Sequence, residues 1–175
     1  AAPDGNLWFG ESGTNKIGRI TTAGVITEFT LPTAGSRSNM IAVGSDGLPV
    51  VSYVDQTAGK IKVAHCDDIN CATATLNTIS DPANGLGGDT SIAIGSDGLP
   101  VVAYQSTNLA TLKVAKCSTP DCSGSSTITT LDDPDNAVGG FNSIAIGADG
   151  LPIVSYYDLT AGALKVAKCL AADCR

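Results

Sequence analysis

The chain has 175 residues, a formal net charge of −7 and 15% charged residues, against the roughly 25% typical of soluble domains. This length allows one domain with a hydrophobic core of its own. The negative charge argues against nucleic acid and anionic membrane as partners. No apolar run approaches the length of about 18 residues that a membrane span needs, so insertion into a membrane is not expected.

Residues 1–37 are expected to form one small β unit. Three runs of β-forming residues, 7–9, 16–20 and 25–29, are separated by turn residues such as Gly and Asn. Gly permits a positive φ and Asn bonds its own backbone, so both mark tight turns. The spacing predicts a meander of short strands.

Residues 38–175 repeat one pattern three times. The copies read SNMIAVGSDGLPVVSY (38–53), TSIAIGSDGLPVVAY (90–104) and NSIAIGADGLPIVSY (142–156). Gly44 and Gly95 are 51 residues apart, and Gly95 and Gly147 are 52 apart. A period of this size predicts stacked units that bury one another's apolar faces. We expect a single repeat domain, residues 1–175, divided into 1–37, 38–88, 89–141 and an incomplete unit 142–175.

Each long copy is interpreted as four short antiparallel strands. In the first copy these cover residues 40–43, 48–53, 60–66 and 72–79. Apolar and polar residues alternate along 60–66, which is typical of a half-buried strand. Four-stranded units in tandem, joined by tight turns, predict an all-β fold, a β-propeller of about four blades. A β-solenoid is the alternative.

The first unit carries a resemblance to a known family. Its pattern PDGNLWF…ESGTNKIGRIT…LPT, within residues 2–36, closely resembles a blade of the virginiamycin B lyase (streptogramin lyase) family, which is a seven-bladed propeller. That family uses a His general base and Mg²⁺. His65 is the only His and lies outside this unit, so none of the family's functional residues carries over and lyase activity is not expected. The three long copies resemble a propeller-type repeat of large secreted bacterial proteins.

The repeat pattern is incomplete at both ends. The first unit lacks most of an inner strand, and the last lacks an outer strand. Three architectures fit this pattern: part of a longer propeller, a small closed ring with an imperfect seam, and a ring or fibre completed by a neighbouring chain. Because exposed strand edges are templates for pairing, self-association through open blade edges is predicted.

Six cysteines occur as three pairs with four residues between the members of each pair. Pairing within each copy predicts three local disulfides. A repeated zinc site is the rival interpretation, but His65 stands where the other copies have Lys116 and Lys168, and a zinc site does not exchange a ligand for Lys. Disulfides imply an oxidising compartment, so we expect an extracellular, cell-surface or periplasmic protein. The paired cysteines are Cys66, Cys71, Cys117, Cys122, Cys169 and Cys174.

Two sets of repeated residues are candidate ligand-binding positions. A Tyr at one blade position can stack on a sugar, although such a residue more often packs between blades. An Asp in each Gly-Ser/Ala-Asp-Gly turn is first a turn-forming residue, but a ring of carboxylates is also suited to Ca²⁺. The tyrosines are Tyr53, Tyr104 and Tyr156, and the turn acids are Asp46, Asp97 and Asp149.

No catalytic constellation is found in the sequence. His65 shares a strand face with Ile61 and Val63, which favours a packed residue over a general base. The densest acidic cluster, Asp132, Asp133 and Asp135, is interpreted as a solvated loop. We therefore predict no cofactor and no bound metal, with calcium as the alternative.

Two functional classes follow from these patterns. The first is a non-catalytic extracellular module that binds a glycan or protein ligand or assembles with itself. The second is part of a glycan- or lactone-active propeller enzyme, a lyase or hydrolase, whose catalytic residues lie outside this chain. The near-identity of the copies favours the first class.

Overall fold

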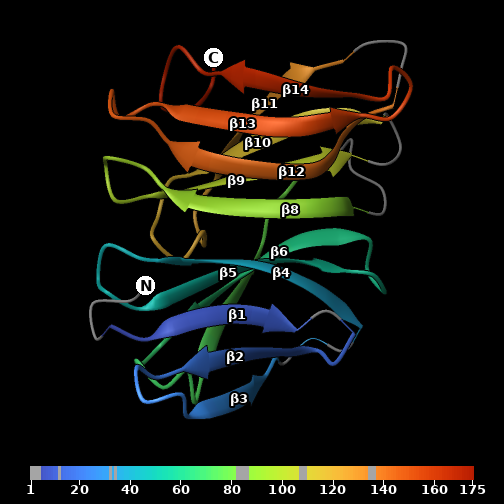
Figure 1. Cartoon of the computed structure of the whole chain (residues 1–175). Helices are drawn as coiled ribbons and strands as arrows, with labels where there is room; N and C mark the ends of the chain where they lie inside the picture. Colours follow the sequence, from blue (N-terminus) through green and yellow to red (C-terminus); the bar gives the residue numbers. More distant parts are fainter. Residues whose placement is uncertain are drawn as a thin grey trace.

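Side chains of an extended strand alternate between the two faces of a sheet. When neighbouring sheets bury both faces, a short run of consecutive apolar residues is suited to a strand. The computed structural model describes residues 5–11, 13–31, 33, 35–81, 87–106, 110–133 and 137–175. These residues form four antiparallel sheets (Figure 1). None of the described residues lies in a helix long and apolar enough to cross a membrane.

The first sheet is a meander of three strands in the order β1 (Leu7–Glu11), β2 (Lys16–Ile20) and β3 (Ile26–Thr30). The segment after β3 brings the Thr33 hydroxyl to 2.8 Å from the Tyr53 hydroxyl in the next sheet. After the outer strand of the second sheet, Asp81 accepts a hydrogen bond from Tyr104 in the same way. The three strands of the first sheet therefore correspond to the second, third and fourth strands of a complete blade.

The second sheet has four strands in the order β4 (Ser36–Val43), β5 (Pro49–Asp55), β6 (Lys60–Cys66) and β7 (Ala74–Thr78). The third repeats it with β8 (Gly87–Ile94), β9 (Pro100–Ser106), β10 (Thr111–Cys117) and β11 (Ser126–Asp132). The fourth contains three described strands, β12 (Val138–Ile146), β13 (Pro152–Asp158) and β14 (Ala163–Lys168). All neighbouring strands are antiparallel and consecutive in the chain.

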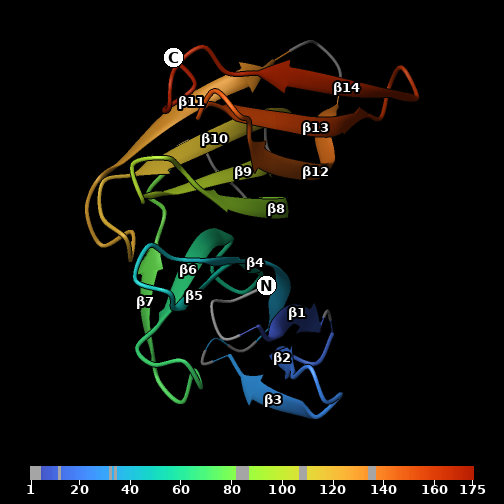
Figure 2. The ribbon, with the colours of Figure 1, turned by 60° about the vertical axis from the view of Figure 1, so that its left-hand side comes forward.

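The four sheets are stacked in chain order, like the blades of a propeller. The first strands β4, β8 and β12 lie next to one another along the stack. Figures 1 and 2 show the first sheet at one end of the stack and the last sheet at the other. The described sheets therefore form an open arc. The alternative of a β-solenoid is wrong, because each sheet is an antiparallel meander built from one repeat.

Apolar residues between the sheets form three clusters, one for each pair of neighbouring sheets. The middle cluster contains Val54, Ile61 and Val63 of the second sheet and Val102 and Tyr104 of the third. β6, the strand expected to be half-buried, combines buried and partly buried residues, whereas the residues of β10 are all buried. A central blade is covered on both faces, and even the polar positions of the alternating pattern lie inside.

Each inner strand contains a β-bulge, and β4 begins at Ser36, before the expected run 40–43. The pairing register shifts between Ser38 and Met40, between Gly87 and Thr90, and between Gly140 and Ser143. A bulge places an extra residue on one strand and redirects its side chain. The hydrophobic pattern marks only the regular part of each inner strand, so it does not detect the residues that precede the bulge.

Candidate functional site

The tyrosine repeated in each long copy joins neighbouring blades. Tyr104 is fully buried, and its hydroxyl donates a hydrogen bond of 2.8 Å to Asp81 of the preceding sheet. Lys113 donates to the same carboxylate at 2.9 Å, and both Lys113 and Asp81 are buried. Burial, followed by the bond to Asp81, raises the pKa of Tyr104 above its ordinary value. These three side chains form a buried polar triad between the second and third sheets.

The same triad recurs, more exposed, between the third and fourth sheets. Tyr156 donates to Asp132 at 2.6 Å and Lys165 donates to it at 2.5 Å. Burial opposes ionisation of Asp132, but hydrogen bonds from Lys165 and Tyr156 outweigh it and hold the pKa of this carboxyl below its ordinary value. Since Tyr156, like Tyr104, is buried between sheets, its position fits a packing role better than the stacking on a sugar that the sequence also allows.

Between the first and second sheets the triad is altered. Tyr53 is fully buried but meets the Thr33 hydroxyl, not a carboxylate. Lys62 pairs instead with Asp55 of its own sheet, at 2.9 Å. The first blade has Thr33 where the later blades have Asp81 and Asp132. Asp55, within the second blade, supplies the carboxylate that Lys62 would otherwise lack.

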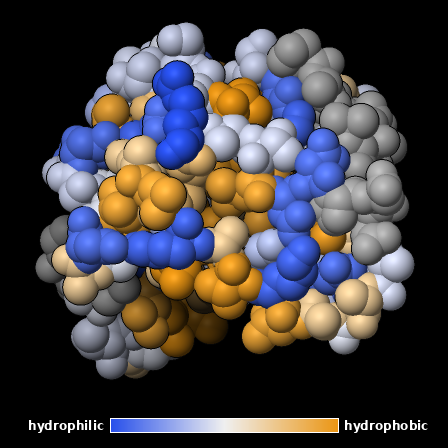
Figure 3. Space-filling view, turned by 90° about the horizontal axis from the view of Figure 1, so that it is seen from above, coloured by the Kyte–Doolittle hydropathy of each residue, from blue (hydrophilic) through white to orange (hydrophobic). Residues whose placement is uncertain are grey.

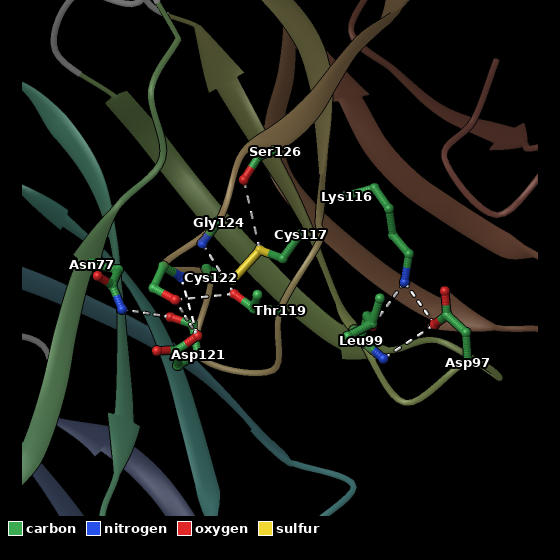
Figure 4. Close-up of a disulfide and its surroundings, with 11 residues drawn as sticks. Asn77, Asp97, Leu99, Lys116, Cys117, Thr119, Asp121, Cys122, Gly124 and Ser126 are labelled. Carbon is green, nitrogen blue, oxygen red and sulfur yellow. Dashed lines mark hydrogen bonds and ion pairs between the residues drawn. A yellow bond between two sulfur atoms is a disulfide. The ribbon is translucent and has the colours of Figure 1, made fainter.

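Asp97 and Asp149 each fasten a tight turn to the third strand of their own blade. Asp97 accepts the Leu99 N–H at 3.1 Å and a hydrogen bond from Lys116 at 2.7 Å (Figure 4). Asp149 accepts the equivalent bonds from Leu151 and Lys168. A side-chain oxygen bonded two residues ahead is the Asx-turn that Asp favours.

In the first long copy, His65 takes the place of the turn-fastening Lys. Its Nε2 lies 3.0 Å from the Asp46 carboxylate, but the ring N–H is not aimed at the oxygen in hydrogen-bond geometry. The side chain is largely buried beside the turn. The exchange of Lys for His therefore keeps a side-chain nitrogen beside the Asp46 carboxylate at this position.

Acid is expected to weaken these turns. Hydrogen bonds from Lys168 and Leu151 lower the pKa of Asp149; for Asp97, burial opposes ionisation, but bonds from Lys116 and Leu99 still lower the pKa. A carboxyl whose folded pKa lies below its unfolded one stabilises the fold above the unfolded pKa, and this contribution is lost as the pH falls through the folded pKa. Urea unfolding should therefore give a lower free energy at about pH 3 than at about pH 5.

The variant Asp97→Asn tests the origin of this pH dependence. It removes one titrating carboxyl and should flatten the acid limb of the stability curve. An unchanged acid limb in both Asp97→Asn and Asp149→Asn would contradict the assignment.

All three predicted disulfides are present: Cys66–Cys71, Cys117–Cys122 and Cys169–Cys174. The second Cys of each pair has a positive φ, between 50° and 61°, which a non-glycine residue adopts at some cost. Each bond closes a short loop after the third strand of its blade. Three disulfides indicate a non-cytoplasmic, oxidising environment.

The Cys loops contact the preceding sheet. Asn77 on β7 donates to the Asp121 carbonyl in the loop of the third sheet at 2.8 Å (Figure 4). Thr129 on β11 donates to the Asp173 carbonyl at 2.8 Å. In the first interface Arg19 donates to Asn70 at 2.9 Å. Each disulfide thus shapes a loop that fastens its blade to the one before it.

Removal of one disulfide is expected to destabilise the chain moderately. The double variant Cys117→Ser/Cys122→Ser should lower the free energy of unfolding by about 2 kcal/mol, because a short closed loop constrains the unfolded chain. Chemical unfolding of the wild type and the double variant, both without a reductant, measures the effect. Asn77→Ala is the companion variant, since it removes the contact between blades and leaves the loop closed. No loss in the double variant would show that the disulfide carries no stability.

The acidic cluster lies outside any site in the described part of the chain. Asp132 belongs to the triad with Lys165, Asp133 follows it, and Asp135 lies outside the described residues. Among the residues that the structure describes, no three His, Cys, Asp or Glu side chains converge as metal ligands.

A pocket of about 830 Å³ lies where the inner strands begin. Figure 1 shows β8 and β12 starting on the same side of the stack, at the end opposite to the Asp turns. The pocket is built from all four sheets and from the bulged segments at the start of the inner strands. Its lining residues are Gly13, Thr14, Asn15, Gly35, Ser36, Met40, Val54, Gln56, Gly88, Asp89, Thr90, Phe141 and Asn142.

Phe141 is the most unusual residue of this pocket. Its side chain is 77% exposed and its φ is +49°, in the left-handed region that favours glycine. Asp89 of the neighbouring inner strand accepts the Phe141 N–H at 2.8 Å, and the ring meets Tyr157 edge to face. A strained backbone that presents an aromatic ring to solvent is typical of a functional position.

Asn142 and Asn15 stiffen the polar wall of the pocket. The Asn142 amide donates to the carbonyls of Asp89 and Gly139, each at 2.9 Å, while its Oδ1 has no partner among the described residues. Asn15 donates to the Leu31 carbonyl at 2.8 Å and accepts from Ser36. The wall therefore offers fixed amide and hydroxyl groups beside the exposed ring.

Sequence reasoning missed this pocket. The three copies have Ser38, Asp89 and Phe141 at equivalent positions, just before the repeated Ile-Ala run. Three chemically different residues at one position of an otherwise regular repeat were the available signal. The repeated tyrosines are buried between the blades, whereas the repeated turn acids are exposed in the turns of their own blades.

Comparisons with known proteins agree on the fold. No model of a known family matches the chain, and no curated protein matches it. Virginiamycin B lyase from Staphylococcus aureus is similar in structure, with a TM-score of 0.59 and 22% identity over 98% of this chain and 55% of that one. An endo-arabinase from Bacteroides thetaiotaomicron matches with a TM-score of 0.60 and 11% identity over 97% of this chain and 73% of that one.

A third similar structure is a mutant of the NanB sialidase from Streptococcus pneumoniae, with a TM-score of 0.59 and 16% identity over 93% of this chain and 29% of that one. At such identities the likeness concerns the fold alone. The chain is thus an all-β protein of the β-propeller type, as the sequence predicts. It spans about half the length of the lyase structures that it matches.

Proposed function

We propose that this chain is a non-catalytic binding module of an extracellular protein and that its ligand occupies the pocket where the inner strands begin. One observation carries the proposal: most of the repeat positions that line this pocket hold different residues in the three copies, while the repeated Tyr and Asp residues build the blades. Bulged strand ends and strained residues are both concentrated at functional sites. The extracellular location rests on the three disulfides.

The lining chemistry suits a neutral glycan. Thr14, Gln56 and Thr90 supply hydroxyl and amide groups, which both donate and accept hydrogen bonds. Phe141 and Met40 supply exposed apolar surface beside them. A sugar ring presents hydroxyls at its edge and C–H groups on its faces, and a pocket that combines apolar surface with a few fixed polar groups matches both.

Calorimetric titration with a panel of neutral oligosaccharides tests the proposal. We expect saturable binding to at least one of them, and Phe141→Ala should weaken it about tenfold, as truncation of an aromatic anchor does. Phe9→Ala is the matched control, since Phe9 is an exposed aromatic on the first sheet and does not line the pocket. Absence of binding to the whole panel, or equal weakening in both variants, would overturn the proposal.

The competing function is that of an enzyme part active on glycans or lactones. Mass spectrometry of the same mixtures separates the two functions. A binding module leaves the oligosaccharide intact. Cleavage by the wild-type chain would replace the binding proposal by a catalytic one.

A protein ligand at the same pocket gives a different result. In that case Phe141→Ala should weaken the complex with the protein, while titration with the sugars releases no heat.

A further inference from the structure

The last sheet has an apolar face that no described residue of the chain covers. On β14, Leu164 is 76% exposed and Val166 is 59% exposed. The strand register places them opposite Tyr157 and Ser155 of β13, so the four side chains share one face. Figure 3 views the stack from above, where this sheet lies, and shows hydrophobic residues gathered across the middle between bands of hydrophilic ones.

The same face is fully buried in the two preceding sheets. Leu112 and Val114 occupy the positions of Leu164 and Val166 in the third sheet, and both pack in the cluster shared with the fourth sheet. Ile61 and Val63 occupy them in the second sheet and pack in the cluster shared with the third. The exposed face of the last sheet therefore corresponds to the faces that the second and third sheets bury against the sheet that follows them. The surface that fits it is the face that a blade turns toward the preceding blade.

A matching blade face is exposed at the other end of the arc. Leu7 and Phe9 on β1 and Ile26 on β3 are exposed on the side of the first sheet that does not face the second. Phe9 pairs with Gly18 two residues before the turn between β1 and β2. At the equivalent place in the second sheet, Tyr53 pairs with Lys62. Tyr104 and Lys113 both donate hydrogen bonds to a carboxylate of the preceding blade. Phe9 and Gly18 have no side-chain donor, so the face of the first sheet needs no such carboxylate from the blade it meets.

We propose that a second copy of this chain covers the exposed face of the last sheet, head to tail. The β13–β14 face of one copy packs on the β1–β2 face of the other, as each blade packs on the next within the chain. Association occurs through blade faces, which differs from the pairing of open strand edges predicted from the sequence. The proposal does not depend on the glycan pocket.

Sedimentation velocity of residues 1–175, from low to high micromolar concentration, tests the proposal. We expect reversible association that Leu164→Lys abolishes, because a lysine cannot be buried in an apolar interface without a partner. Leu170→Lys is the matched control: Leu170 is 87% exposed but lies in the Cys loop, outside the sheet face. A monomer at all concentrations, or an equal effect of both variants, would overturn the proposal.

A mixing experiment tests the head-to-tail arrangement. Leu7→Lys blocks the face of the first sheet, so this variant should also be monomeric on its own. A mixture of Leu7→Lys with Leu164→Lys retains one intact pair of faces and should form a one-to-one complex. If Leu7→Lys associates like the wild type, the last sheets meet each other and the head-to-tail proposal is wrong. Circular dichroism of each variant checks that the exposed substitutions leave the fold intact.

Discussion

Replacement of Asp81 by alanine is expected to lower the free energy of unfolding by about 3–5 kcal/mol, as happens when one partner of a buried ion pair is removed. Asp81 is 3% exposed and Lys113 is 5% exposed, with Nζ and the carboxylate 2.9 Å apart. Without Asp81 the Lys113 ammonium remains buried between two sheets, and the Tyr104 hydroxyl loses its acceptor. Urea unfolding of the wild type and the variant measures the difference.

The repeat offers a matched control for this variant at the equivalent position. Asp132→Ala should cost only about 1 kcal/mol, because exposed ion pairs contribute little. The Lys165 side chain is 38% exposed and has a second carboxylate, Asp158, at 3.9 Å. Tyr104→Phe removes one hydroxyl alone and should also cost about 1 kcal/mol. Equal losses for Asp81→Ala and Asp132→Ala would show that burial of the lysine is not the cause.

Leu112→Ala is expected to destabilise the chain by about 2–5 kcal/mol, the usual range for a leucine truncated in a core. Leu112 is fully buried between the third and fourth sheets. Gly139 of β12 lies against it so closely that a Cβ there would be 3.1 Å from the Leu112 Cα. Gly139 has no side chain that could move into the cavity left by Leu112→Ala, so little relaxation is expected.

The equivalent substitution in the next blade separates burial from residue type. Leu164→Ala changes the same repeat position on the exposed face, so the stability of the monomer should change by less than about 0.5 kcal/mol. Thermal or urea unfolding at low protein concentration compares the two variants. A loss in Leu164→Ala as large as in Leu112→Ala would contradict the interface described for the third and fourth sheets.

The sequence predicts most of the strands, because their signals are local. The bounds of β2 and β6 agree with the runs 16–20 and 60–66, where apolar alternation and turn residues coincide. The start of β4 is missed, since Ser36, Arg37 and Ser38 are polar and precede the bulge between Ser38 and Met40. The disulfides are predicted as well, because each joins residues only five positions apart.

The candidate site could not be predicted in the same way, because it depends on contacts between blades. Asp81 and Lys113 are 32 residues apart in sequence, and Asp89 and Phe141 are 52 apart. No local pattern indicates that such residues meet. Repetition identifies the positions of Tyr104 and Asp97, but only the stacking of the sheets shows that the first joins blades and the second fastens a turn.

The interlocking of the blades has a direction that bears on biosynthesis. The Tyr104 hydroxyl and the loop of Cys117 and Cys122 both reach back to the second sheet, and Tyr156 and the loop of Cys169 and Cys174 reach back to the third. A ribosome delivers the N-terminal blades first. The residues to which each blade docks are therefore synthesised before the blade itself.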